Sequence, residues 1–373
     1  MKPEHLLIAP ILIPLVAAAI MLFYDDRHRR QRRIVSLTSA VALLFVALEL
    51  MDMAKDTDAA GNGVVSVYLL GNWPPPFAIV LVLDRLSALM LLLTALLAIP
   101  ALVFSTARWD GRGQHFHSLF QFLLMGLNGA FLTGDLFNLY VGFEVLLMAS
   151  YVLLTLGGSR SRVRAGITYV VVNVVSSLVF LVGIALVYAA VGTLNLAQIS
   201  QRMEAVPPGT ALAIHLVLLT AFGIKAAVFP LSAWLPDSYP TAAAPVTAVF
   251  AGLLTKVGVY SIIRTETLIF PDSEVTQTIL LVAAGLTMLV GALGAIAQAD
   301  IKRILSFTLV SHIGYMIFGV ALATPLGVAG AVFYVVHHIT VQATLFCVVG
   351  LIEGVGGSTS VTRLGGLMKA SPV

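Results

Sequence analysis

Five ionisable side chains lie within apolar stretches of the chain. Glu144 lies in GDLFNLYVGFEVLLMASYVLL, Lys225 in AFGIKAAVFPLSAWLPD and Lys256 in AGLLTKVGVY, while His312 and His338 lie in LVSHIGYM and YVVHHITVQATLF. A charge at the centre of a bilayer costs at least about 2.5–3.5 kcal/mol, so each one needs a partner or a function. Because Glu, Lys and His can all hold and release a proton, the set predicts proton conduction.

Two prolines interrupt the apolar run that contains Lys225. Pro230 follows it by five residues in FPLSAWLPD, and Pro236 lies in the same segment. A proline inside a helix has no N–H to donate to the carbonyl four residues before it, so the helix is expected to open at Ala226. In lipid the freed carbonyl must face protein or water. The pattern predicts a broken helix beside an ionisable side chain.

Each of these residues also has a structural interpretation. Glu144, Lys225 and Lys256 could form ion pairs that hold helices together, and the histidines could make hydrogen bonds to a neighbouring helix. Three such charges beside a broken helix favour a conducting path. Asp84, in VLVLDRLSALM, is expected to neutralise a group on a neighbouring helix, and Asp135, in TGDLF, is expected to cap the helix after it. For both aspartates a role in ion access is the alternative.

The composition is that of a polytopic membrane protein. Of 373 residues 59% are hydrophobic and 10% charged, and the mean hydropathy is +0.99, whereas soluble domains carry about 25% charged residues. At about 20 apolar residues per crossing, this suffices for about eleven helices. Apolar runs place them near residues 6–24, 34–54, 77–106, 116–133, 135–157, 164–191, 211–238, 243–263, 275–298, 301–322 and 327–352. The polar stretch 193–204 is expected to form a short interfacial helix.

Positive charge is distributed unequally between alternate loops. One side carries Arg27, Arg29, Arg30, Arg32, Arg33, Arg108, Arg112, Arg160, Arg162, Arg164, Lys302, Arg303, Arg363 and Lys369, and the other carries Lys2, Lys55, Arg202 and Arg264. The positive-inside rule then puts the N-terminus outside and Val373 inside. The net charge of +3 reflects this topology and does not imply binding to nucleic acid. His115, His117 and His215, near the ends of spans, are expected to be interfacial.

The sequence has no pattern typical of a soluble enzyme. It contains no phosphate-binding loop, no metal-ligand cluster and no nucleophile elbow. The single Cys347 excludes an internal disulfide and a Cys-ligated cluster. We therefore expect no cofactor on this chain, and an ion transporter subunit in place of an enzyme. A stand-alone transporter of an organic solute is an alternative, which predicts a midplane pocket lined by hydrogen-bonding groups.

These residues also resemble a known family. LFQFLLMGLNGAFLTGDLFNLYVGFEVLLMASYVLL and FGIKAAVFPLSAWLPDSYPTAAAPVTAVFAGLLTKVGVY look like the antiporter-like subunits shared by multisubunit Mrp cation/proton antiporters, respiratory complex I and membrane-bound hydrogenases. The Glu of the fifth span, the Lys before FP…WLPD and the Lys of the eighth span are specific for this superfamily. Within it, GNWPPPFAIVLVLDRLSALM looks most like the Mrp D subunit.

The resemblance implies an all-α membrane fold of about fourteen helices in the family, about eleven of them in this chain, with inverted five-helix repeats that each contain a broken helix. It divides the chain into an N-terminal three-helix segment (1–110), a first repeat of helices four to eight (111–265) and a partial second repeat (266–373). The second broken helix is not among these residues, so we expect no complete second half-channel in them.

The resemblance also assigns roles in a proton pathway. Glu144 is the membrane carboxylate, Lys225 its paired lysine, Lys256 the connecting lysine and His338 the relay histidine, with His312 beside it. Family members commonly carry Lys where VQATLF places Gln342. Because Gln carries no exchangeable charge, the proton-conducting role of the eleventh span does not follow from the resemblance at this position.

The function implied is that of a proton-translocating subunit of an Mrp-type antiporter, which exchanges cytoplasmic Na+ for external H+ across a prokaryotic plasma membrane. Its partners are the other subunits of the complex, membrane lipid, protons and Na+. The alternative is a proton-pumping membrane subunit of a redox complex related to complex I or a hydrogenase. Flavin or iron–sulfur absorbance in the purified complex would favour that alternative.

Overall fold

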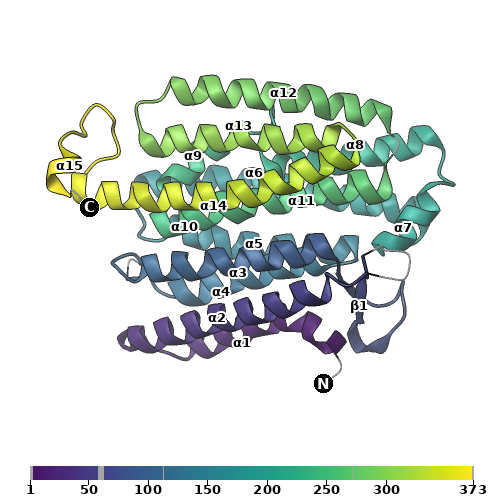
Figure 1. The fold of residues 1–373 in the computed structure, drawn as a ribbon, viewed down its shortest axis with the longest axis horizontal. Coiled ribbons are helices and arrows are strands. Elements are labelled where there is room, and N and C mark those ends of the chain that lie inside the picture. The colour runs from purple at the N-terminus through teal and green to yellow at the C-terminus, as the bar shows by residue number, and fades with distance from the viewer. Residues whose placement is uncertain (1–2, 58–62, 112, 272, 372–373) are drawn as a thin grey trace. The chain divides into compact units, whose positions relative to one another are not determined.

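The structure, a computed structural model, describes residues 3–57, 63–111, 113–271 and 273–371 (Figure 1). Lys2, Arg112 and Val373, which entered the topology prediction, lie outside these residues. The α-helices are α1 (Ala9–Leu22), α2 (Arg29–Met53), α3 (Arg85–Ser105), α4 (Phe116–Leu132), α5 (Leu136–Thr155), α6 (Arg160–Val191), α7 (Leu196–Met203), α8 (Pro208–Ala226), α9 (Leu235–Ser238), α10 (Ala244–Val249), α11 (Thr255–Arg264), α12 (Glu274–Ile296), α13 (Ile301–Ala321), α14 (Pro325–Gly356) and α15 (Leu367–Ala370).

Shorter elements complete the described chain. Four 3-10 helices are η1 (Pro3–Ile8), η2 (Asp26–His28), η3 (Leu70–Asn72) and η4 (Tyr239–Thr241). Two π-helices, η5 (Phe250–Leu254) and η6 (Thr265–Ile269), flank α11. Strands β1 (Ser66–Leu69) and β2 (Val80–Leu83) pair antiparallel, with Ser66 opposite Leu83.

Each predicted span corresponds to an observed helix or to a helix with a break. Among the described residues ten helices are long and apolar enough to cross a bilayer, and α4 is a shorter apolar helix. Predicted span 211–238 is α8 followed by an interruption and α9, and span 243–263 comprises α10, η5 and α11. The short helix predicted at 193–204 is α7. The fold class predicted from the sequence, an all-α membrane protein with a broken seventh helix, is confirmed.

The third span is shorter than predicted. Residues 77–84 are not helical, because Val80–Leu83 form β2 and Asp84 stops the helix from extending backwards. The Asp84 carboxylate accepts the backbone N–H of Ser87 at 2.8 Å, and the Ser87 hydroxyl accepts the N–H of Asp84 at 2.9 Å. This reciprocal capping box fixes the first residue of α3 at Arg85.

The chain forms two compact units that alternate along the sequence. Unit 1 contains Met1–Leu153, Val175–Ala221 and Arg264–Pro271, and unit 2 contains Leu154–Val174, Phe222–Ile263 and Asp272–Val373. The division expected from the family, 1–110, 111–265 and 266–373, stays a prediction, as does the inverted relation of its repeats.

In unit 1, α1 packs against α2 and α4, and α2 packs against α3. Pro14 in α1 has no N–H for the carbonyl of Pro10, and the Asn128 amide of α4 donates to that carbonyl at 2.8 Å. Gly126 of α4 lies so close to α5 that an added Cβ would stand 2.5 Å from the backbone nitrogen of Leu146. Small and amide side chains therefore bring these helices together, as is typical in membranes.

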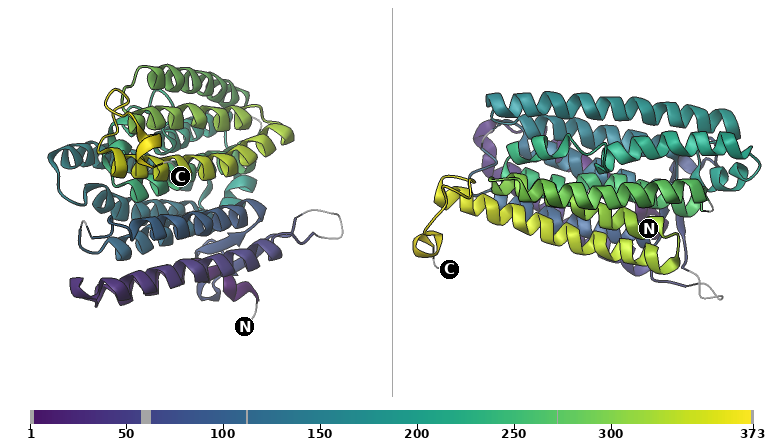
Figure 2. Two further views of the ribbon diagram at one scale, coloured as in Figure 1. Left: turned by 60° about the vertical axis from the view of Figure 1, so that its left-hand side comes forward. Right: turned by 90° about the horizontal axis from the view of Figure 1, so that it is seen from above.

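In unit 2, α13 packs between α12 and α14, and the three helices lie side by side in the left view of Figure 2. The segment α10–η5 packs against α14. Every residue from Ala244 to Ile263 is buried. Because a lipid-facing helix would leave one side exposed, this continuous burial identifies residues 244–263 as the core of the unit.

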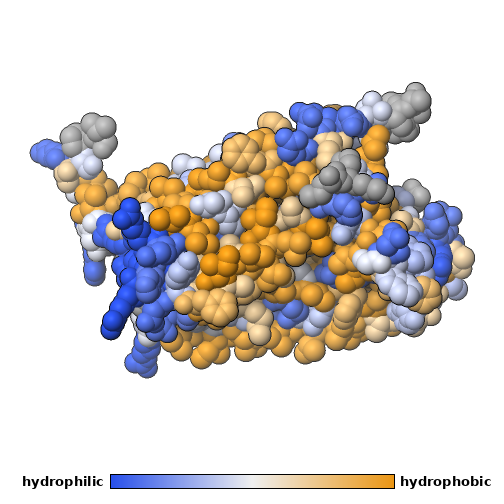
Figure 3. Space-filling model, turned by 90° about the horizontal axis from the view of Figure 1, so that it is seen from below, coloured by the Kyte–Doolittle hydropathy of each residue, from blue (hydrophilic) through white to orange (hydrophobic). Residues whose placement is uncertain are grey.

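Apolar side chains cover much of the molecular surface. On the face drawn in Figure 3 they form a broad orange area, and hydrophilic side chains gather toward its ends. Along α1 and α2, the residues Val16, Ile20, Ile34 and Phe45 are 44–66% exposed. A soluble protein rarely exposes so large an apolar area, so this surface fits contact with lipid.

Candidate functional site

Glu144 lies half-buried on α5 in unit 1. Its carboxylate accepts a short hydrogen bond from the Ser177 hydroxyl of α6. The sequence predicted that Glu144 has its partner on another helix. Within unit 1 that partner is the Ser177 hydroxyl, which is a neutral donor. A hydroxyl can hold the carboxylate in place without fixing its charge, because Ser can donate to the ionised form and accept from the protonated one.

Lys225 lies in unit 2 on the last turn of α8, which ends at Ala226. Its side chain is buried, and its ammonium nitrogen lies 3.5 Å from the carbonyl oxygen of Asn173. Ala227, which directly follows the helix, has a left-handed backbone (φ +60°). Pro236 lies in the first turn of α9, where a proline is tolerated.

The interrupted segment has its own backbone hydrogen bonds. The N–H of Val228 donates to the carbonyl of Gly223 at 2.9 Å, and the indole N–H of Trp234 donates to the carbonyl of Ile224 at 3.1 Å. Gly258 of α11 packs so tightly here that an added Cβ would stand 2.5 Å from the nitrogen of Ala226. The break beside Lys225 is thus an ordered feature, held against the helix that carries Lys256.

Lys256 is completely buried in the first turn of α11. Its ammonium group donates to the carbonyl of Ala251, at 2.6 Å, and to the hydroxyl of Thr255, at 3.3 Å. Within the described residues of unit 2 it forms no ion pair. The Ala251 carbonyl belongs to the π-helix η5, and π-helical turns are frequent at functional sites.

Two histidines of the same unit feel the charge of Lys256, and a tyrosine contacts one of them. That charge acts on both imidazoles, those of His312 on α13 and His338 on α14, whose ring centroids are 4.9 Å apart. His312 Nδ1 lies 2.5 Å from the Tyr334 hydroxyl. His338 is 1% exposed, and neither ring nitrogen has a hydrogen-bond partner among the described residues. Unit 2 therefore gathers four proton-carrying side chains.

Gln342 occupies a buried position one turn beyond His338 on α14. Its amide donates to the carbonyl of Leu305 on α13 at 2.8 Å. Gln cannot carry a proton as Lys does, so here it joins two helices. Further along the same helices, Lys302 forms an ion pair with Glu353 at 2.7 Å.

Asp84 has a second role in unit 1 besides capping α3. Its two carboxylate oxygens bind the guanidinium group of Arg264, with nitrogen–oxygen distances of 2.5 and 2.7 Å. Burial raises the pKa of the Asp84 carboxyl, but the hydrogen bonds and charge of Arg264 outweigh it and hold that pKa below its ordinary value. The bidentate pair has the geometry of a structural contact.

Replacing Asp84 by Asn should destabilise the protein by about 1–3 kcal/mol, because it weakens the cap and leaves Arg264 without its counter-charge. Thermal unfolding of the purified complex measures this. The pKa of Asp84 is lower in the folded than in the unfolded state. Ionised Asp84 therefore adds to the free energy of unfolding at pH values above its unfolded pKa of about 3.9, and this stabilisation disappears as the pH falls through the folded pKa.

The matched control is Asp52→Asn, which removes an exposed pair with Lys55 whose side chains are 80% and 66% exposed. Such surface pairs contribute about 0–1 kcal/mol. Equal shifts for Asp84→Asn and Asp52→Asn at neutral pH would show that the Asp84 pair is not structural.

Asp135 caps α5, as the sequence predicted. Its carboxylate accepts the backbone N–H of Asn138 at 2.8 Å. Burial raises the pKa of the Asp135 carboxyl, and the backbone hydrogen bonds from Asn138 and Phe137 oppose this shift without cancelling it. Its roles in ion access and proton transfer stay predictions.

Two of the histidines expected near the membrane interface are buried in unit 1 and paired with carboxylates, and their place relative to the membrane stays a prediction. His215 is fully buried, lies 2.5 Å from Glu266 and stacks on Phe270. His117 lies 3.3 Å from Asp110. Sequence reasoning missed the first pair because its partners are 51 residues apart. It missed the second because Asp110 lies in a polar loop, where nothing in the composition signals burial.

The family follows from comparison with known proteins. Residues 133–373 match the family described as "NADH:quinone oxidoreductase/Mrp antiporter, TM", which is more than half of the chain. The chain belongs to this family. Within it, the chain is similar to the D subunit of a Na(+)/H(+) antiporter of Alkalihalophilus pseudofirmus, with 43% identity over 99% of the chain and 74% of that protein.

Two further similarities place it among the antiporter D subunits of the family. A protein of Rhizobium meliloti named as the probable D subunit of a K(+)/H(+) antiporter is 43% identical over 94% of the chain and 66% of its own length. The solved Mrp complex from Dietzia sp. contains a chain with a TM-score of 0.93 and 35% identity, covering all of this chain and 69% of that one. The family predicted from the sequence is confirmed, and members of it work in multisubunit complexes.

Proposed function

We propose that this chain is a proton-translocating subunit of a multisubunit cation/proton antiporter that exchanges cytoplasmic Na+ for external H+. The observation that carries the proposal is the arrangement around Lys256. A fully buried ammonium group without an ion-pair partner in the described part of its unit is held only by two oxygen acceptors. Its charge acts on two imidazoles whose ring centroids are 4.9 Å apart. The similarity to sodium/proton antiporter D subunits supports it.

The proposed relay in unit 2 uses the residues that lie together there. In the proposed relay a proton held on Lys256 passes to His338, whose two ring nitrogens have no hydrogen-bond partner in the described chain. The neighbouring His312 and the Tyr334 hydroxyl extend this chain of carriers. Each transfer moves one proton and leaves the donor ready to be protonated again. Glu144 is the proposed carrier in unit 1, and Lys225 joins the relay beside the helix break.

The proposed setting is a prokaryotic plasma membrane, with the N-terminus outside. It rests on the unequal distribution of Lys and Arg between alternate loops. The names of the relatives differ in the cation, sodium in one and potassium in another, and Na+ is the ion we propose here.

The test is cation/proton exchange by the complete complex in inside-out membrane vesicles. A respiration-driven proton gradient is established, and Na+ or K+ is added. We expect Na+ to dissipate the proton gradient. If only K+ dissipates it, the exchanged cation is K+ and not Na+. A complex that responds to neither and carries flavin or iron–sulfur absorbance would instead favour the related redox-driven proton pump.

A further inference from the structure

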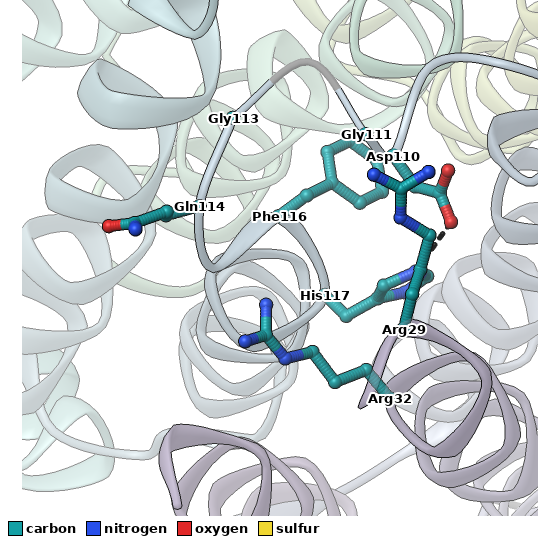
Figure 4. A pocket seen from close by; sticks show the side chains of 8 residues that line it. All are labelled: Arg29, Arg32, Asp110, Gly111, Gly113, Gln114, Phe116 and His117. Atoms are coloured by element: carbon teal, nitrogen blue, oxygen red, sulfur yellow. Dashed lines mark hydrogen bonds and ion pairs between the residues drawn. The ribbon is translucent and has the colours of Figure 1, made fainter. Parts of the chain in front are cut away.

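A pocket in unit 1 lies outside the proposed proton pathway (Figure 4). It has a volume of about 250 Å³ and lies where the start of α2 meets the segment that leads from α3 into α4. The residues of its lining that matter here are Arg29, Arg32, Asp110, Gly111 and His117.

The one carboxylate in this lining is already engaged. Asp110 binds Arg33 through two hydrogen bonds, of 2.5 and 2.9 Å, and lies 3.3 Å from His117. Burial raises the pKa of the Asp110 carboxyl, but hydrogen bonds from Arg33 and His117 outweigh it and lower that pKa. Since Asp110 is ionised and matched by Arg33, no carboxylate of the described lining offsets the positive charge of Arg29.

The pocket also offers hydrogen-bond donors that other groups do not use. Arg29 makes no hydrogen bond or ion pair within the described part of the chain, although its guanidinium lies against Gly111. His117 is 2% exposed and its Nε2 faces the ionised Asp110 carboxylate, so in the neutral ring Nε2 is the donor and Asp110 already uses it. Arg32 is anchored by a 2.5 Å hydrogen bond to the carbonyl of Tyr24.

We propose that this pocket binds the phosphate group of an anionic phospholipid. Arginine side chains bind phosphate through paired charge-assisted hydrogen bonds, and basic pockets between membrane helices are typical headgroup sites. The occupant is a lipid because an apolar groove runs between α1 and α2 and is lined by Leu12, Ile20 and Ile34. Ile34 lies five residues after Arg29, about 7.5 Å further along the axis of α2, so the acyl chain of a lipid bound at Arg29 can reach this groove.

The test measures lipid binding and does not rest on the proposed function. The complete complex is purified in detergent and titrated with dioleoylphosphatidylglycerol or with dioleoylphosphatidylcholine. Native mass spectrometry then counts the lipid bound to this subunit. Arg29→Gln should weaken binding of phosphatidylglycerol by about tenfold or more, the effect of losing a hydrogen bond to a charged group. The matched control is Arg30→Gln, an exposed neighbour that does not line the pocket.

Gly111→Ala provides a second variant that keeps every charge. The added Cβ would stand 2.6 Å from the Arg29 guanidinium, so this flexible group must move out of its position. We expect weaker binding of phosphatidylglycerol here too, which a non-specific attraction to the positive surface would not produce. This variant also decides the matter if Arg29→Gln fails to assemble.

Each result supports or overturns the proposal. Loss of phosphatidylglycerol in Arg29→Gln and Gly111→Ala, with binding kept in Arg30→Gln, supports it. Equal binding of the two lipids, or equal effects of Arg29→Gln and Arg30→Gln, overturns it. Binding of inorganic phosphate that Arg29→Gln abolishes, in a complex that binds no phosphatidylglycerol, would overturn the lipid as occupant and assign the site to free phosphate.

Discussion

Replacing Glu144 by Gln is expected to reduce cation/proton exchange by about 100-fold or more, the scale on which loss of a proton-transfer group slows a reaction. Gln has nearly the shape of Glu and can still accept the hydrogen bond from Ser177, so packing of α5 against α6 should persist. Gln cannot take up and release a proton. The loss should therefore appear in transport and not in assembly.

Exchange in inside-out vesicles, with subunit abundance measured in parallel, separates these effects. Glu204→Gln is the matched control in unit 1, because Glu204 is exposed at the end of α7 and should tolerate the change. Ser177→Ala should lower exchange less than Glu144→Gln, since it removes the positioning donor and keeps the carboxylate. Wild-type exchange by a normally assembled Glu144→Gln complex would remove Glu144 from the pathway.

Lys256 is expected to tolerate neither Ala nor Arg. Lys256→Ala removes the proton carrier from a site where the ammonium has two oxygen acceptors, on Ala251 and Thr255. Lys256→Arg keeps a positive charge, but a guanidinium does not release its proton in a protein. If transfer and not charge alone is required, both variants should lose exchange by about 100-fold or more.

A third variant guards against a packing effect at this fully buried position. Lys256→Gln is neutral and smaller than Arg, and it should assemble but not conduct. Lys369→Ala, which changes an exposed lysine of unit 2, should leave exchange unchanged. An active Lys256→Arg complex would show that a fixed positive charge is sufficient and would end the proposed relay through Lys256.

Features that depend on local chemistry could be predicted from the sequence. Hydropathy located the spans, because an apolar run of sufficient length crosses a bilayer whatever its neighbours are. Pro230 located the break after Lys225, because the missing N–H is a covalent property of proline. Asp135 was predicted as a cap from its place just before α5, since capping needs only the next turn of backbone.

Which side chains meet became known only from the packed chain. Arg264 and Asp84 are 180 residues apart, and no pattern in the sequence joins them. The start of α3 was predicted wrongly, because β2 forms by pairing with β1, a contact that hydropathy does not report. Burial of Lys256 beside His338 likewise depends on how α10 and η5 pack against α14. Such pairings follow from packing between segments far apart in sequence, whereas hydropathy and helix breaks follow from each segment alone.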